Sequence, residues 1–218
     1  MKDNYTHITV LLDRTGSMQS IRQDTIGGFN AFLNQQKEEP DLATLTLVQF
    51  DSQDPYEVVH NFRAIQSVPE LTQATFVPRA STPLLDAMGR CINDLEQNLM
   101  AIAEAERPAR MVVVVITDGQ ENASREFRAE QVRSMIQEKQ DNNDWQFVFL
   151  SADLAAINDA LASGVKASAT MAFDKNSRGT AAVWKSASAR IADYRAARKP
   201  GVAFSNEDRV QQESERQR

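Results

Sequence analysis

The feature that most constrains the fold is an unbroken apolar run, MVVVVIT, at residues 111–117. A strand with one face in water alternates apolar and polar side chains, and this run does not. Continuous Val and Ile content is typical of a strand in a parallel sheet with helices over both faces. The run therefore predicts an α/β domain.

Other strand-like segments alternate with segments that carry an apolar residue every three or four positions, which is the βαβ pattern of a mostly parallel sheet. The further predicted strands are residues 7–12, 45–50, 147–151 and 167–173. Residues 56–62 follow the 45–50 strand too closely for a helix to intervene, so we expect an antiparallel edge strand there.

Helices are predicted by apolar stripes, the longest of which runs from Leu85 to Ile102 at steps of three and four. The elements together predict a doubly wound, mostly parallel six-stranded sheet of order 3-2-1-4-5-6 with helices on both faces. We expect one domain over residues 1–197. Residues 198–218 lose apolar periodicity and are mostly polar, which predicts a flexible C-terminal tail.

The charge balance and the residue types exclude several classes of function. The 218 residues carry a net charge of -6, whereas nucleic-acid binders need a basic face. No stretch approaches the roughly 18 apolar residues of a membrane span, so we expect neither a nucleic-acid nor a membrane partner. The single cysteine, Cys91, excludes an internal disulfide and a cysteine-based zinc site, and a cytoplasmic setting is the simplest expectation.

Oxygen-bearing side chains occur in three loops that the predicted sheet would bring together. Asp13, Thr15 and Ser17 stand at alternate positions after the first strand, so their side chains can converge. Asp118 ends the most apolar strand, and Thr82 begins the long helix that leads into that strand. In the predicted order the first and fourth strands are neighbours where the order reverses, and open α/β sheets bind ligands there. We therefore expect all these side chains to meet.

Two carboxylates and three hydroxyls form an all-oxygen donor set, which favours Mg²⁺ or Mn²⁺ over zinc. Neutral hydroxyls leave a bound cation electron-poor, so an open coordination position could accept an Asp or Glu carboxylate from another protein. No general base or activated nucleophile stands beside the set in the sequence. The set therefore favours a metal-bridged protein-binding module over an enzyme.

The set resembles the metal-ion-dependent adhesion site of von Willebrand factor type A domains, in which a D-x-S-x-S motif is joined by a Thr and an Asp from two further loops. The matching positions are Asp13, Thr15, Ser17, Thr82 and Asp118, with Thr15 in place of the commoner Ser. The resemblance covers roughly residues 5–196, and the strings TIGGFNAFL and ITDGQENASREF are similar to small stand-alone bacterial or phage members. It implies that these five residues hold a divalent cation and that a ligand carboxylate completes its coordination.

Two other functions stay open. A Mg²⁺-dependent phosphotransferase or phosphatase of haloacid dehalogenase type also has an Asp after its first strand, but its D-x-D pattern conflicts with Thr15. In a metal-free scaffold, Asp13 and Ser17 would only cap a helix and Asp118 would only form a turn.

Several other residues are interpreted as structural. His7 lies on a predicted strand without a Cys or His partner nearby in the sequence. Gly27 and Gly28 lie inside a predicted helix, where each costs about 1 kcal/mol relative to Ala, and this indicates close packing on the sheet. Asp51 and Glu121 are expected in solvated loops.

Overall fold

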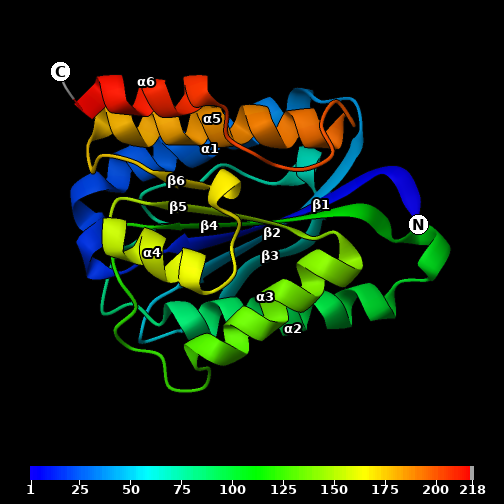
Figure 1. Cartoon of the computed structure of the whole chain (residues 1–218), viewed down its shortest axis with the longest axis horizontal. Helices are drawn as coiled ribbons and strands as arrows, with labels where there is room; N and C mark the ends of the chain where they lie inside the picture. Colours follow the sequence, from blue (N-terminus) through cyan, green and yellow to red (C-terminus); the bar gives the residue numbers. More distant parts are fainter. Residues whose placement is uncertain (217–218) are drawn as a thin grey trace.

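One six-stranded sheet with helices on both sides makes up the computed structural model, which describes residues 1–216 (Figure 1). The strands are β1 (Lys2–Asp13), β2 (Leu42–Phe50), β3 (Glu57–Ala64), β4 (Pro108–Thr117), β5 (Gln146–Ser151) and β6 (Thr170–Ala172). The α-helices are α1 (Arg22–Glu38), α2 (Leu84–Ala101), α3 (Ala129–Asn143), α4 (Leu154–Ala162), α5 (Ser177–Arg195) and α6 (Asn206–Arg216). A 3-10 helix, η1 (Gly16–Ile21), connects β1 to α1.

The strand order is β3-β2-β1-β4-β5-β6, which confirms the predicted topology. The pair β2 and β3 is antiparallel and the other neighbouring pairs are parallel. The predicted last strand, residues 167–173, is shorter in the structure because residues 167–169 form a 3-10 turn, in which the Thr170 hydroxyl donates to the Ala167 carbonyl at 3.0 Å. The order reverses between β1 and β4, so these two central strands send the chain to opposite faces.

Alternate side chains of the central strands enter two separate apolar layers. Ile8, Val10 and Leu12 of β1 pack with residues of α1 and α5, whereas Leu11 packs with residues of α2. Figure 1 shows α1, α5 and α6 over one face of the sheet and α2 and α3 over the other. The run at residues 111–117 lies in β4 with both faces covered, and this explains why it lacks polar alternation.

The two helices of the first layer meet at a glycine. A Cβ atom built on Gly28 of α1 would lie 2.0 Å from Cδ1 of Trp184 in α5, whereas nothing lies within 4 Å of a Cβ built on Gly27. Of these two positions, close packing therefore requires glycine at Gly28 and not at Gly27. Its neighbour is α5 rather than the sheet expected from the sequence.

The C-terminal segment differs from the flexible tail expected over residues 198–218. Val202 and Phe204 are buried in the layer of α1 and α5, and α6 packs on α5. The Ser205 N–H donates to Asp208 Oδ2 at 2.7 Å and the Asp208 N–H donates to Ser205 Oγ at 3.2 Å, which caps the start of α6. The sequence conceals this helix because two of its buried positions are polar, Asp208 and Gln212. Residues 217 and 218 lie outside the described part.

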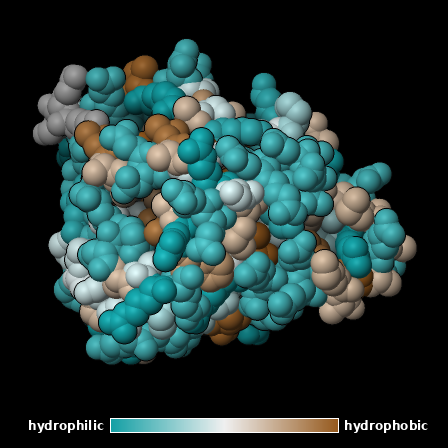
Figure 2. All heavy atoms as spheres, turned by 60° about the horizontal axis from the view of Figure 1, so that its bottom comes forward, coloured by the Kyte–Doolittle hydropathy of each residue, from teal (hydrophilic) through white to brown (hydrophobic). Residues whose placement is uncertain are grey.

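The surface over α2 and α3 is predominantly hydrophilic, with small and separate apolar patches (Figure 2). None of the helices formed by residues 1–216 combines the length and the apolar character that crossing a membrane requires.

Candidate metal site

The carboxyl ends of β1 and β4 lie side by side because these strands are parallel neighbours. Asp13 ends β1, and Asp118 directly follows β4. The Thr117 hydroxyl donates to Asp13 Oδ2 at 2.6 Å, and the Thr15 N–H donates to Asp13 Oδ1 at 2.7 Å. Asp13 is thus fixed by one hydrogen bond from β4 and one from its own loop.

A chain of oxygen atoms runs from the β1 loop to Asp118. Thr15 Oγ1 and Ser17 Oγ are 3.1 Å apart, and Ser17 Oγ donates to Asp118 Oδ1 at 2.6 Å. Asp13, Thr15 and Asp118 are buried, whereas Ser17 is exposed and gives the group access to solvent. Four of the five predicted ligands therefore lie together. Ser17 does not cap the first helix, since no side-chain hydrogen bond caps η1.

Thr82 lies between the other two loops and is held there by its backbone. The Gly16 N–H donates to the Ala80 carbonyl at 3.0 Å, and the Thr82 N–H donates to Asn122 Oδ1 at 2.8 Å. Thr82 is buried, but within residues 1–216 its hydroxyl forms no hydrogen bond to the other four predicted ligands. The Thr82 loop therefore lies beside the other four predicted ligands, but the Thr82 side chain is not hydrogen-bonded to them.

The start of α2 is capped by the loop after β4 and not by Thr82. Glu121 Oε2 accepts from the Leu85 N–H at 2.9 Å, and Ser124 Oγ accepts from the Asp86 N–H at 3.0 Å. The Asp86 carboxylate in turn accepts from three successive backbone N–H groups of that loop. Glu121, expected in a solvated loop, is instead an anchor that joins the Asp118 loop to α2.

Electrostatics makes this group receptive to a cation. Burial raises the pKa of Asp13 to about 7, although hydrogen bonds from Thr117 and Thr15 lower it, and the charge of Asp118 raises it as well. In the described chain, no group of three or more His, Cys, Asp and Glu side chains is placed to hold a metal ion. A cation here must therefore take hydroxyl and water ligands besides the two carboxylates, which the all-oxygen set permits.

A lysine that the sequence did not indicate lies beside Asp118. Lys175 Nζ lies 2.5 Å from Asp118 Oδ2 in an ion pair, and no other described residue donates a hydrogen bond to this oxygen. The side chain of Lys175 is 36% exposed and that of Asp118 is fully buried. Lys175 follows β6. The sequence indicates its position in one way only: the residue comes after a parallel strand, so it lies at the carboxyl ends of the strands, as Asp13 and Asp118 do.

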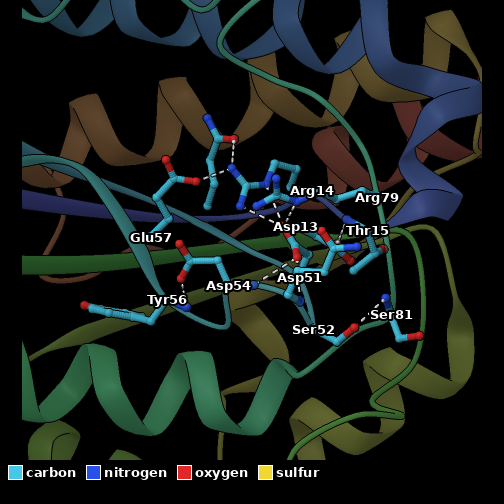
Figure 3. A network of polar contacts seen from close by, with 12 residues as sticks. Asp13, Arg14, Thr15, Asp51, Ser52, Asp54, Tyr56, Glu57, Arg79 and Ser81 are labelled. Carbon is cyan, nitrogen blue, oxygen red and sulfur yellow. Dashed lines mark hydrogen bonds and ion pairs between the residues drawn. The ribbon is translucent and has the colours of Figure 1, made fainter.

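A buried ionic network that the sequence did not indicate lies beside Asp13 and Thr15 (Figure 3). Arg14 Nε and Arg79 Nε each donate to Asp51 Oδ2 at 2.9 Å. Arg14 also pairs with Glu57 and donates to Gln49 Oε1 at 3.3 Å. Asp51 is fully buried, so its interpretation as a solvated loop residue was wrong.

The network keeps Asp51 ionised. Burial by itself raises the pKa of this carboxyl group, but hydrogen bonds from the Gln53 and Asp54 N–H groups and from Arg79 and Arg14 outweigh burial and lower the pKa. Asp51 therefore has its charge balanced inside the protein, and the network fixes the loop after β2 against the β1 loop.

The fold and these three loops define a known class of domain. The family model for the von Willebrand factor type A domain matches residues 7–177. The chain belongs to this family. No curated protein matches the sequence.

Solved structures with this fold are distant in sequence. The manganese-loaded TRAP protein of Plasmodium vivax aligns with a TM-score of 0.59 at 15% identity, over 94% of this chain and 76% of that one. A von Willebrand factor type A protein from Catenulispora acidiphila gives 0.58 at 11% identity, over 87% and 43%. The mussel byssus proximal thread matrix protein 1, with a zinc-occupied MIDAS motif, gives 0.51 at 15% identity, over 78% and 42%. This chain thus spans less than half of the last two, and these likenesses concern the fold alone.

Proposed function

We propose that this chain is a protein-binding domain that depends on a divalent cation. The residues proposed to hold the cation are Asp13, Thr15, Ser17, Thr82 and Asp118. Members of the family commonly act as metal-dependent interaction modules and are generally not enzymes. The observation that supports the proposal most directly is the hydrogen-bonded chain from Thr15 through Ser17 to Asp118, beside the buried Asp13.

The proposed cation is Mg²⁺ or Mn²⁺. Carboxylate and hydroxyl oxygens are hard ligands, and Mg²⁺ is commonly held by one or two carboxylates with water in its remaining positions. The Plasmodium vivax protein of similar fold is manganese-loaded and the mussel protein has zinc in its MIDAS motif, which supports a divalent cation in general. The absence of His and Cys from the donor set favours the harder ions here.

The proposed ligand of the cation is an Asp or Glu side chain of a partner protein. Three of the five donors are neutral hydroxyls, so a bound cation keeps much of its charge and attracts a further anionic oxygen. Ser17 is exposed, and a partner can therefore approach on its side. Asp13 and Asp118 would hold the cation from the buried side, and the partner carboxylate would bind from solvent.

Thermal unfolding and calorimetric titration with Mg²⁺ and Mn²⁺ test the metal site. A cation that binds only the native state at 100 times its dissociation constant adds about 2.7 kcal/mol, or roughly 5–10 °C in Tm for a chain of this size. Asp118→Asn should abolish this gain. Asp159→Asn, an equal charge change at an exposed position of α4, should preserve it. Equal melting of the wild type in Mg²⁺ and in chelator would favour the metal-free scaffold.

Water-proton relaxation of the Mn²⁺-loaded protein tests the partner carboxylate. A peptide that carries one Glu should displace metal-bound water and reduce the relaxation rate, whereas the same peptide with Gln should not. A phosphate-ester assay with Mg²⁺ tests the phosphotransferase alternative. Sustained turnover that is lost in Asp13→Asn would favour the enzyme over the binding domain.

A further inference from the structure

The two carboxylate oxygens of Asp118 have different partners. Oδ1 accepts a hydrogen bond from Ser17 at 2.6 Å, within the proposed donor set. Oδ2 forms an ion pair with Lys175, whose Nζ lies 2.5 Å away, and no other residue of the described chain donates a hydrogen bond to it. Among the described residues, the only basic side chain paired with the proposed ligands thus comes from the segment between β6 and α5, and β6 is three strands away from β1 in the sheet.

We propose that Lys175 is a tethered counter-ion that competes with the divalent cation for Asp118, and this inference rests on the proposed function. An ammonium group and a metal ion are both attracted to the same buried carboxylate, and they repel each other at close range. The cation therefore binds tightly only when the Lys175 side chain has moved away. The competition multiplies the intrinsic affinity of the site by the fraction of time that the ion pair is open.

The backbone around Lys175 is fixed, so the movement is confined to the side chain. The Phe173 N–H donates to the Ser151 carbonyl at 3.0 Å, which ties the segment to β5. Asn176 Oδ1 accepts from the Gly179 N–H at 2.9 Å and caps α5. A Cβ atom built on Gly179 would lie 2.4 Å from the Asp174 carbonyl oxygen, so helix and segment are in close contact.

The Lys175 side chain has room to move. It is 36% exposed, whereas Asp118 is fully buried, so the ammonium group reaches the carboxylate from the solvent side. A lysine side chain has a flexible four-carbon stem and loses rotamer entropy when it is held in one geometry. Displacement into water restores both hydration and entropy, and this makes the ion pair reversible on cation binding.

Calorimetric titration of Mn²⁺ and Mg²⁺ into Lys175→Met tests the competition. If the ion pair is formed about nine-tenths of the time, the variant should bind each cation about tenfold more tightly than the wild type. Lys185→Met makes the same charge change on α5, where Lys185 lies beside Gly27 and Trp184 instead, and should leave the affinity unchanged. Equal or weaker binding by Lys175→Met would overturn the inference.

Amine acylation followed by mass spectrometry provides a second readout. Lys175 should react slowly in chelator and several-fold faster in saturating Mg²⁺, because its ion pair is then broken, while Lys185 should react equally in both. In Asp118→Asn, Lys175 should react fast even in chelator. If Lys175 reacts equally fast in all three cases, the ion pair does not hold it and the inference is wrong.

The two proposals fail in different ways. If the wild type binds Mn²⁺ and Lys175→Met binds it with the same affinity, the competition is absent and the metal site stands. If neither protein binds Mn²⁺ or Mg²⁺, the proposed function fails and the competition fails with it.

Discussion

Asp13 and Arg14 are consecutive residues at the end of β1, yet they belong to two groups with opposite charge balance. Arg14 and Arg79 pair with Asp51 and Glu57, so that network contains two cations and two anions. Asp13 faces hydroxyls and a second carboxylate, and the pKa of its own carboxyl group is raised by burial to about 7. One side of the strand end has paired charges, whereas the other keeps a surplus of negative charge, because Lys175 pairs with only one of its two carboxylates.

This difference in charge balance indicates that the Arg14 network supports the structure, whereas the carboxylates of Asp13 and Asp118 are suited to bind a cation. A buried ionic network with paired charges holds loops in place and has little to gain from a ligand. Two buried carboxylates with hydroxyl neighbours gain from any cation that enters, because the cation offsets their repulsion and their desolvation. The comparison predicts that substitutions in the first group change stability and leave cation binding intact, while substitutions in the second group do the reverse.

The largest change in stability is expected from Asp51→Ala. The variant leaves the buried Arg14 guanidinium without its principal carboxylate, and breaking a buried pair costs about 3–5 kcal/mol. Urea unfolding measures this loss. The Tm gain in Mg²⁺ should persist, since none of the five proposed ligands is removed. A loss below about 1 kcal/mol would show that the network does not support the loops.

The next largest effect is the pH dependence that His7 imposes from the interior of β1. Both of its ring nitrogens lie within hydrogen-bond distance of hydroxyls, those of Thr44 at 2.8 Å and Thr9 at 3.1 Å, and its ring stacks on Phe62. Burial lowers the pKa of His7 from 6.5 to about 3. The unfolded chain then binds more protons than the native one between these values, so stability falls as the pH drops from about 6.5 to about 3.

His7→Gln should remove this dependence. Between pH 6.5 and 5 the wild type should lose about 1.6 kcal/mol through His7, because the slope approaches about 1.4 kcal/mol per pH unit only below the pKa of the unfolded chain. Urea unfolding of both proteins at several pH values in chelator gives the difference. Parallel profiles for variant and wild type would show that His7 is not held neutral in the native protein.

A smaller change in stability, about 1 kcal/mol or less in chelator, is expected from Asp13→Asn. The variant loses one hydrogen bond, and this cost is offset by the removal of a buried charge. The Tm gain in Mg²⁺ should nevertheless disappear completely. Melting in Mg²⁺ and in chelator measures both effects. A large loss in chelator would place Asp13 with the supporting group and break the comparison.

The smallest effect is expected from Glu57→Gln. Glu57 pairs with Arg14, but its side chain is 44% exposed, and exposed ion pairs contribute about 0.2–1 kcal/mol. Urea unfolding at low and high salt measures this contribution, which salt should reduce. A loss as large as that of Asp51→Ala would mean that the exposed half of the network is as important as the buried half.

The sheet order could be predicted because it depends on patterns within single segments and on the order of those segments along the chain. The continuous apolar run of β4 and the alternation of elements fix a parallel sheet, and the ends of neighbouring parallel strands must meet. Asp13 and Asp118 are adjacent for this reason. Ser17 follows Asp13 so closely that the loop brings both to the same place.

The remaining contacts could not be predicted because they depend on how distant loops meet. Lys175 and Asp51 reach their partners only after the segments that follow β6 and β2 have folded against the centre of the sheet. The sequence led us to expect a capping hydroxyl at Thr82, but the cap of α2 comes from Glu121, whose role no local pattern indicates. Polar composition also concealed α6, since its capping residues and its buried positions are polar.

The burial of Val202 and Phe204 has a practical consequence for recombinant work. A fragment that stops at residue 197, where apolar periodicity ends, would lack two side chains of the layer of α1 and α5. It would also expose to water the side of α5 that α6 covers. Newly exposed apolar surface of this kind promotes aggregation. Affinity tags and fusion partners are therefore best joined after residue 216, because a shortened product could precipitate for reasons unrelated to cation binding.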